Sequence, residues 1–272
     1  MVSESIERVG HSAPPAHLSV ADISKRFGGV QALERIEFEV ARGEVMALVG
    51  DNGAGKSTLM KILAGAYVAD EGSFQLEGKP VSIASPQDAT RLGIQIVYQD
   101  LALCENLDVS ANLSLGSEPI KPGWGFLPRC LRPIDDLLME KTALKAIDQL
   151  QVRTLKSVRA RVGGLSGGQR QAIAIARAVG ADSSVVLLDE PTAALGVVQT
   201  RQVLDVVKRL RDTNHAVVYI SHNLKDIFEI SDRITVLRHG SNVATYRTDG
   251  TTPDEIVVAM TAGVTAGSTD AD

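Results

Sequence analysis

Short stretches in the first hundred positions of the chain are apolar or alternate between apolar and polar residues. A period of two predicts a strand, and an apolar residue at every third or fourth position predicts a helix. We therefore expect a helix at 56–66 and strands at 17–23, 35–40, 44–50, 72–78 and 93–99. Later, apolar runs at 183–191, 215–222 and 233–240 alternate with helical segments. That alternation is typical of a parallel sheet covered by helices.

The middle of the chain has a different pattern. Helical periodicity is found at 105–116 and 135–152, and the stretch between them is rich in Gly and Pro and predicts a loop that carries Trp124. We expect a mostly helical insertion at about 100–166 within a single domain that spans 17–262. The polar ends, 1–16 and 263–272, are predicted to be disordered tails.

Composition narrows the function classes. The 272 residues carry a net charge of −5, which argues against a nucleic-acid binder. Cys104 and Cys130 have no CxxC spacing and are interpreted as ordinary thiols in a reducing compartment, with a disulfide between them as the alternative. No apolar run reaches the roughly 18–20 residues that a membrane span needs, and the N-terminus lacks the apolar stretch of a signal peptide.

A glycine-rich phosphate loop follows the predicted strand at 44–50. The stretch GDNGAGKST fits G-x-x-x-x-G-K-[ST] and opens a helix, which is the context that the motif requires. Its backbone N–H groups can surround phosphates, Lys56 supplies charge to the β- and γ-phosphates, Ser57 can ligate Mg²⁺, and Thr58 reaches the α-phosphate. The predicted nucleotide-binding residues are Gly50, Asp51, Asn52, Gly53, Ala54, Gly55, Lys56, Ser57 and Thr58.

A second motif ends the apolar run VVLLDEP. Asp189 and Glu190 follow four apolar residues, so they lie at the carboxyl end of a predicted buried strand, where active sites of parallel sheets form. Asp189 is placed to hold Mg²⁺ directly or through water. Glu190 can accept a proton from water that attacks the γ-phosphate. Without the phosphate loop upstream, a solvated acidic turn at the end of a strand would be the favoured interpretation of the pair.

The stretch LSGGQ, residues 165–169, begins another helix, and Asp189 follows Ser166 by 23 positions. Here the sequence closely resembles the ATP-binding cassette (ABC) family, of which LSGGQ is the signature. The resemblance covers about 17–263. It implies an α/β fold with a P-loop NTPase core of the ABC type, a mainly parallel sheet, an N-terminal antiparallel β part and a helical subdomain.

The resemblance also assigns roles to single residues. Gln99 in VYQD and His222 in YISHN match the family's Q-loop glutamine and switch histidine, and Phe27 in KRFGG stands where the family stacks an aromatic ring on adenine. The implied catalytic residues are Glu190, His222, Gln99 and Lys56. The implied Mg²⁺ ligands are Ser57, Gln99 and Asp189. Phe27 alone would also fit a core position.

In this family two cassettes pair head to tail, and the phosphate loop of one chain faces the signature of the other. The resemblance thus implies that Ser166, Gly167, Gly168 and Gln169 bind ATP held by a second chain, most simply an identical copy in a two-fold dimer. The helix that begins there directs its positive end toward the anion. Gly196 departs from the family, because Asp is frequent at that position, and this puts a cross-dimer contact by that Asp in doubt.

The opening RFGGVQAL, the stretch TAALGV and the closing PDEIVVAMTAG resemble ATPases of bacterial carbohydrate importers of the ribose, xylose and fructose kind. The resemblance implies an ATP- and Mg²⁺-dependent subunit, peripheral on the cytoplasmic face of the bacterial inner membrane. It would bind permease subunits and act only indirectly with a solute-binding protein. The segment 101–107 is expected either to contact the permease or to belong to the subdomain core. An importer ATPase for another solute and a soluble ABC ATPase remain alternatives, and a GTPase is disfavoured because the sequence has no N-K-x-D motif.

Overall fold

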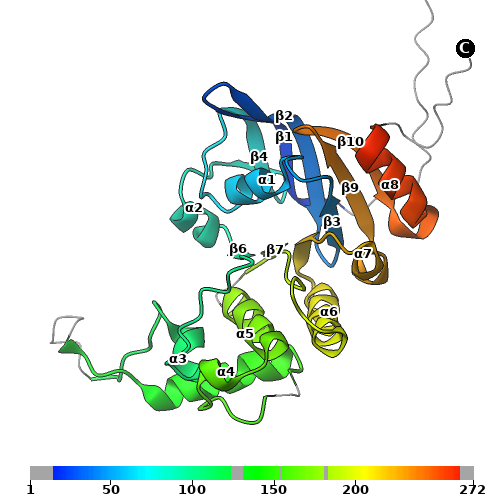
Figure 1. The fold of residues 1–272 in the computed structure, drawn as a ribbon. Coiled ribbons are helices and arrows are strands. Elements are labelled where there is room, and N and C mark those ends of the chain that lie inside the picture. The colour runs from blue at the N-terminus through cyan, green and yellow to red at the C-terminus, as the bar shows by residue number, and fades with distance from the viewer. Residues whose placement is uncertain (1–14, 124–130, 153–154, 181–182, 264–272) are drawn as a thin grey trace, which may run out of the picture.

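Two β-sheets and a lobe of helices form the part of the chain that the structure, a computed structural model, describes: residues 15–123, 131–152, 155–180 and 183–263. The first sheet is antiparallel, in the order β2-β1-β4-β5. Its strands are β1 (Ala16–Phe27), β2 (Val30–Ala41), β4 (Glu71–Leu76) and β5 (Lys79–Val81). This sheet is the expected N-terminal antiparallel part (Figure 1).

The second sheet has the order β10-β9-β3-β8-β7-β6 and is parallel except for its edge strand β10. Its strands are β3 (Val45–Val49), β6 (Ile94–Val97), β7 (Val185–Asp189), β8 (Ala216–Ile220), β9 (Arg233–Arg238) and β10 (Ser241–Arg247). The mainly parallel sheet predicted from the apolar runs is thus confirmed. Strands β3, β7 and β8 lie side by side, so the segments that follow them meet at one edge of the sheet.

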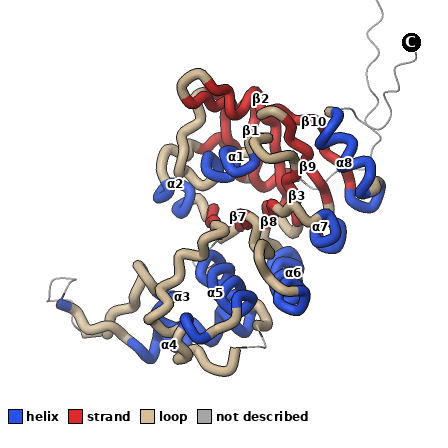
Figure 2. The backbone as a smooth tube through the Cα atoms, viewed as in Figure 1, coloured by secondary structure: helices blue, strands red, loops and turns tan. Residues whose placement is uncertain are grey.

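Eight α-helices connect or flank the strands in the described residues. They are α1 (Lys56–Leu63), α2 (Pro86–Arg91), α3 (Val109–Ser114), α4 (Asp136–Gln149), α5 (Gly167–Val179), α6 (Val197–Asp212), α7 (Leu224–Ile230) and α8 (Pro253–Ala262). Figure 2 shows that helices and loops make up the lower lobe, whereas all long strands lie in the upper part. Among the described helices, none is long and apolar enough to cross a membrane.

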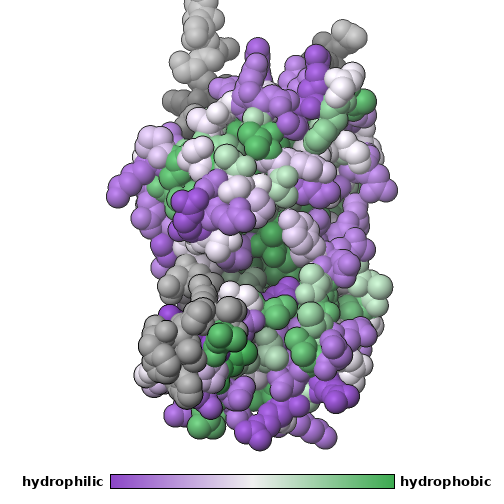
Figure 3. Space-filling model, turned by 90° about the vertical axis from the view of Figure 1, so that its left-hand side faces the viewer, coloured by the Kyte–Doolittle hydropathy of each residue, from purple (hydrophilic) through white to green (hydrophobic). Residues whose placement is uncertain are grey.

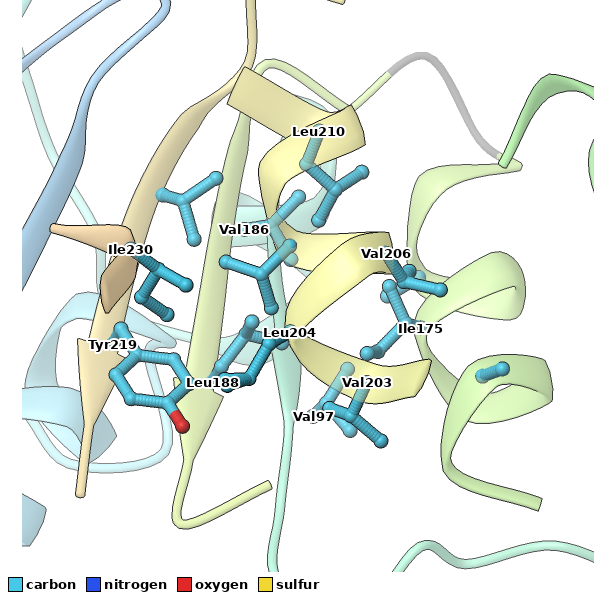
Figure 4. Close-up of a cluster of buried hydrophobic side chains, with 14 of the residues drawn as sticks. Val97, Ile175, Val186, Leu188, Val203, Leu204, Val206, Leu210, Tyr219 and Ile230 are labelled. Carbon is cyan, nitrogen blue, oxygen red and sulfur yellow. The ribbon is translucent and has the colours of Figure 1, made fainter. Parts of the chain in front are cut away.

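The parallel sheet is buried on both faces, which explains its continuous apolar runs. In β7, Val186 and Leu188 face a cluster formed with α5 and α6, whereas Val185 and Leu187 face a second cluster with α1 and the antiparallel sheet. Figure 4 shows the first cluster, in which Tyr219 of β8 lies beside the β7 side chains. The strand ends are therefore anchored from both sides.

The helical lobe differs in detail from the sequence prediction. Asp108 caps α3 by accepting a hydrogen bond from the N–H of Ala111 at 2.7 Å, so the helix begins at Val109 rather than near 105. It ends after six residues, because Leu115 leaves the helical conformation, with φ −57° and ψ 121°. Helix α5 packs with α3 and α4 in the same lobe (Figure 1). Trp124, Cys130 and the two predicted tails lie outside the described residues, apart from the ends of the tails near 15–16 and 263.

Candidate functional site

The loop between β3 and α1 curls around the amino group of Lys56. Lys56 is 6% exposed, and its Nζ donates to the carbonyls of Gly50 at 2.7 Å and Asp51 at 3.0 Å. Burial lowers the pKa of Lys56, and the negative charges of Glu190, Asp51 and Asp189 act in the opposite direction. The ammonium is thus held inside the loop, at the N-terminal end of α1, with acidic groups near it.

Glycines allow this loop to close. Gly50, Gly53 and Gly55 have φ values of +151°, +83° and +99°, in the region that side chains disfavour. A Cβ on Gly50 would lie 2.2 Å from the carbonyl oxygen of Leu237, whereas a Cβ on Gly53 would meet nothing within 4 Å. The first glycine is therefore required by close backbone packing as well as by conformation.

Asp189, Glu190 and His222 meet at the carboxyl ends of β7 and β8. His222 Nε2 lies 2.7 Å from Glu190 Oε1. Glu190 has φ +50°, an uncommon left-handed conformation for a residue with a side chain, and its N–H donates to the carbonyl of Ile220 at 3.0 Å. Burial and the Glu190 charge raise the pKa of Asp189, and the cations Lys61 and Lys56 act against that rise.

A buried polar network supports the two loops that carry Glu190 and His222. Asp226 of α7 is 5% exposed and accepts hydrogen bonds from Thr192 Oγ1 at 3.0 Å and Asn223 Nδ2 at 2.9 Å. Thr192 follows Glu190 by two residues, and Asn223 follows His222 directly. A single buried carboxylate therefore connects both loops, which fixes the position of each relative to the other.

Gln99 lies in the exposed turn that follows β6. Strand β6 pairs with β7 so that Val97 lies opposite Leu188, and the start of this turn therefore lies next to Asp189. The pKa of the neighbouring Tyr98 is raised by burial and by the negative charge of Asp189. The structure therefore brings Lys56, Asp189, Glu190 and His222 to one edge of the sheet and places the Gln99 turn beside them.

Phe27 ends β1 and is 42% exposed, which argues against the core alternative. Its ring meets Tyr67 edge to face at a centroid distance of 5.2 Å, and Lys25 Nζ lies 5.5 Å from the centre of the Phe27 ring. Similarly, Lys61 Nζ lies 5.3 Å from the centre of the Tyr67 ring. The sequence pattern did not single out Tyr67; an aromatic residue shortly after α1 was the only available signal.

The signature residues lie at the start of α5, in the lower lobe, whereas α1 lies in the upper part (Figure 1). Ser166 caps the helix by accepting from the N–H of Gln169 at 3.3 Å, and the Gln169 side chain accepts from the N–H of Ser166 at 2.9 Å. A Cβ on Gly167 would lie 2.8 Å from Leu195 Cδ2, so these glycines also let the turn before α6 approach. Within the chain, the phosphate loop and the signature belong to different lobes.

The donor groups of the acidic edge fit a magnesium ion. Mg²⁺ is bound through one or two carboxylates together with water and substrate phosphates. Asp189 is half-buried beside a second carboxylate, and burial first and the Glu190 charge second raise the pKa of Asp189, so a dication bound there would favour its ionised form. Ser57, in the first turn of α1, adds a hydroxyl at the phosphate loop. In the described residues no three His, Cys, Asp or Glu side chains form a metal cluster of their own.

A phosphate loop between a parallel strand and a helix, with an acidic pair at the end of a neighbouring strand, defines a P-loop nucleotide-binding protein. Residues 33–193 match the family model described as ABC transporter. The chain therefore belongs to the ABC transporter family, and it is an ATPase of that type.

Known relatives extend the match over nearly the whole chain. The fructose import ATP-binding protein FrcA of Rhizobium meliloti is 42% identical over 90% of this chain and 93% of its own length. The xylose/arabinose import ATP-binding protein XylG of Sulfolobus acidocaldarius is 41% identical over the same shares. The ribose import ATP-binding protein RbsA 1 of Rubrobacter xylanophilus is 42% identical over 89% of this chain but only 46% of its own length.

Solved structures show the same fold. A nucleotide-free ATP-binding cassette from an ABC transporter superposes with a TM-score of 0.74 at 27% identity, over 87% of this chain and 92% of that chain. The cassette MJ1267 in its ADP conformation gives a TM-score of 0.73 at 25% identity, over 90% of this chain and 95% of that chain. The α/β fold expected from the resemblance is thereby confirmed.

Proposed function

We propose that this chain is the ATP-hydrolysing subunit of an importer for a monosaccharide. The identity of 42% to a fructose import ATP-binding protein, over 90% of this chain and 93% of the relative, carries the proposal. Relatives named for xylose/arabinose and ribose import support the same substrate class. The sugar itself would be selected by other subunits, because the described site contains groups suited to a nucleotide.

The phosphates of ATP bind in the loop at residues 50–58, where Lys56 and the N-terminal end of α1 provide positive charge. Phe27 stacks on the adenine, and the edge contact from Tyr67 limits how the Phe27 ring can turn. Ser57, Gln99 and Asp189 would hold Mg²⁺. When bound, Mg²⁺ offsets the charge of the phosphate oxygens.

Glu190 acts as the general base. Its carboxylate accepts the proton of the water that attacks the γ-phosphate, and the contact of 2.7 Å with His222 Nε2 holds the carboxylate in place. The network around Asp226 fixes the two loops relative to each other, so Glu190 keeps its position relative to the γ-phosphate during the reaction. His222 is thus suited to position Glu190 and to contact the γ-phosphate.

The complete site needs a second copy of the chain. Ser166, Gly167 and Gly168 lie in the lower lobe, away from the phosphate loop of the same chain (Figure 1). A head-to-tail dimer would bring the signature of one chain to the ATP held by the other, and its two-fold symmetry would form two equivalent sites. Binding of ATP then favours the dimer, and loss of the γ-phosphate releases it.

The permease is proposed to contact the chain where the two lobes meet. A cavity of about 140 Å³ lies there, lined by residues of β6, the Gln99 turn and α5, among them Asp100, Leu101 and Arg177. Leu101 and Leu103 are partly buried against the core. We therefore propose that the 101–107 segment both packs within the helical lobe and contacts the permease. Figure 3 shows one face of the molecule, with apolar side chains on the lower lobe and between the two lobes. A chain bound there is peripheral, on the cytoplasmic side of the membrane.

Reconstitution tests this function. The chain would be purified together with the permease subunits that bind it and inserted into vesicles, and ATP hydrolysis would be measured with each candidate solute and its binding protein. We expect a monosaccharide to raise the hydrolysis rate. Stimulation only by a non-sugar solute would correct the substrate class. Failure to bind any permease would favour a soluble ABC ATPase.

A further inference from the structure

The segment that follows Gln99 is irregular, yet side chains from two helices bind its backbone. Arg177 of α5 donates from Nη1 to the carbonyl of Ala102 at 2.9 Å and from Nη2 to the carbonyl of Leu101 at 3.1 Å. Asn112 of α3 is fully buried and bonds both the N–H and the carbonyl of Cys104. The residues after the Gln99 turn are thus attached to the helical lobe.

Arg177 lies in the last turn of α5, and Ser166 caps the first turn of the same helix. They are eleven positions apart, so the helix spans roughly 16 Å between them at 1.5 Å per residue. A helix of this length is stiff compared with the turn at its end. Leu101 and Ala102 are therefore linked through a single helix to the signature.

We propose that Arg177 is a positioning residue that couples the Gln99 turn to the signature helix. Its planar guanidinium holds the consecutive carbonyls of Leu101 and Ala102, two and three residues after Gln99, so Gln99 and Ser166 move as parts of one body. This inference rests on the proposed function, in which Gln99 acts at the ATP bound by its own chain and Ser166 at the ATP bound by the partner. Arg177 then coordinates the two sites.

Other links between α5 and this segment are weaker or more distant from Gln99. Arg170 Nη1 lies 2.9 Å from Glu105 Oε1, but the Glu105 side chain is 66% exposed, and exposed ion pairs contribute little. Asn112 attaches Cys104 to α3 rather than to α5. Ala102 has φ +48°, an uncommon conformation that the bond to Arg177 helps to maintain. Arg177 therefore provides the link nearest to the turn.

The position of Arg177 also connects this link to the proposed permease contact. The side chain lines the same cavity of about 140 Å³ as Asp100 and Leu101. A permease segment that enters the cavity would touch the guanidinium or the carbonyls that it holds. Through the two hydrogen bonds of Arg177, docking of the permease would then shift both the Gln99 turn and the signature.

The test uses the full chain with Arg177→Gln, Arg177→Lys and the control Arg238→Gln. Arg238 also donates to a backbone carbonyl, that of Ala262 at 3.0 Å, but far from this segment, so the control removes a comparable bond. We would measure binding of a fluorescent ATP analogue, ATP turnover, and hydrogen exchange of the peptide covering 99–105.

In Arg177→Gln we expect analogue binding within about twofold of wild type, turnover lowered roughly ten- to hundredfold, and faster exchange at 99–105, because bonds to a charged group are lost. Arg177→Lys should recover only part of the turnover, because the ammonium keeps the positive charge but lacks the planar fork that holds two carbonyls. Turnover and exchange equal to those of Arg238→Gln would overturn the inference. Absence of turnover in wild type would count against the proposed function, and the exchange measurement would still decide the role of Arg177.

Discussion

The phosphate loop offers a matched pair of substitutions, Gly50→Ala and Gly53→Ala. Both glycines have positive φ, so alanine costs about 1–2 kcal/mol of backbone strain at either position. Only at Gly50 would the new Cβ also lie 2.2 Å from the carbonyl oxygen of Leu237 and 2.9 Å from Cβ of Ala54. Such overpacking adds about 1–3 kcal/mol. The expected loss of stability is thus about 1–2 kcal/mol for Gly53→Ala and about 2–5 kcal/mol for Gly50→Ala.

Thermal unfolding measures the difference. One kcal/mol shifts Tm by about 2–4 °C in a domain of this size, so Gly53→Ala should lower Tm by about 2–8 °C and Gly50→Ala by about 4–20 °C. Gly53→Asn is a further control, because Asn tolerates positive φ better than Ala. Binding of a fluorescent ATP analogue should weaken more in Gly50→Ala than in Gly53→Ala. Equal Tm losses in the two alanine variants would refute the packing argument.

Lys56→Ala should nearly abolish hydrolysis in a phosphate-release assay, because the β- and γ-phosphates lose a fixed counter-charge, and unchanged turnover would remove Lys56 from the mechanism. Ser166→Arg should also be inactive while retaining ATP binding. Mixing Ser166→Arg with Lys56→Ala should restore activity, because one site of each mixed dimer has both wild-type halves. No recovery in proven heterodimers would contradict the shared site. Phe27→Leu should weaken binding of a fluorescent ATP analogue by about 1–3 kcal/mol through loss of stacking, and equal affinity would exclude the ring from adenine binding. Gly196 is the N-cap of α6, has an extended backbone conformation and has open space where a Cβ would lie. Gly196→Asp should therefore raise Tm by about 1–4 °C, whereas a lower Tm would show that the turn cannot accept a side chain.

The apolar pattern predicted the parallel sheet because β3, β8 and the first four residues of β7 are buried on both faces, so each gives a continuous run of mostly apolar residues. It also located the phosphate loop and the acidic pair, since each follows a buried strand. Helix α3 was predicted too long, because periodicity is insensitive to the capping bond that Asp108 makes to the N–H of Ala111. The edge strand β10 was not predicted, as most of its side chains are half-buried or exposed and give little pattern.

Contacts between segments distant in sequence could not be predicted from patterns. Tyr67 meets Phe27 across 40 positions, and Asp226 meets Thr192 across 34 positions only after α7 packs against the sheet. The contact between Glu190 and His222 depends on the adjacency of β7 and β8. These pairs result from packing of the whole domain, whereas the motifs are local and can be recognised from the sequence.

The most direct test of the account is Glu190→Gln in the full chain. The amide cannot accept the proton of the attacking water, so phosphate release should slow by roughly 10²–10⁴ while ATP binding persists. Without hydrolysis, ATP should hold two chains together, and size-exclusion chromatography with light scattering should detect a dimer with ATP and a monomer with ADP. Wild-type protein with ADP is the matched control and should be mostly monomeric. Hydrolysis by Glu190→Gln at the wild-type rate would contradict the role of Glu190, and an inactive variant that stays monomeric with ATP would contradict the shared site.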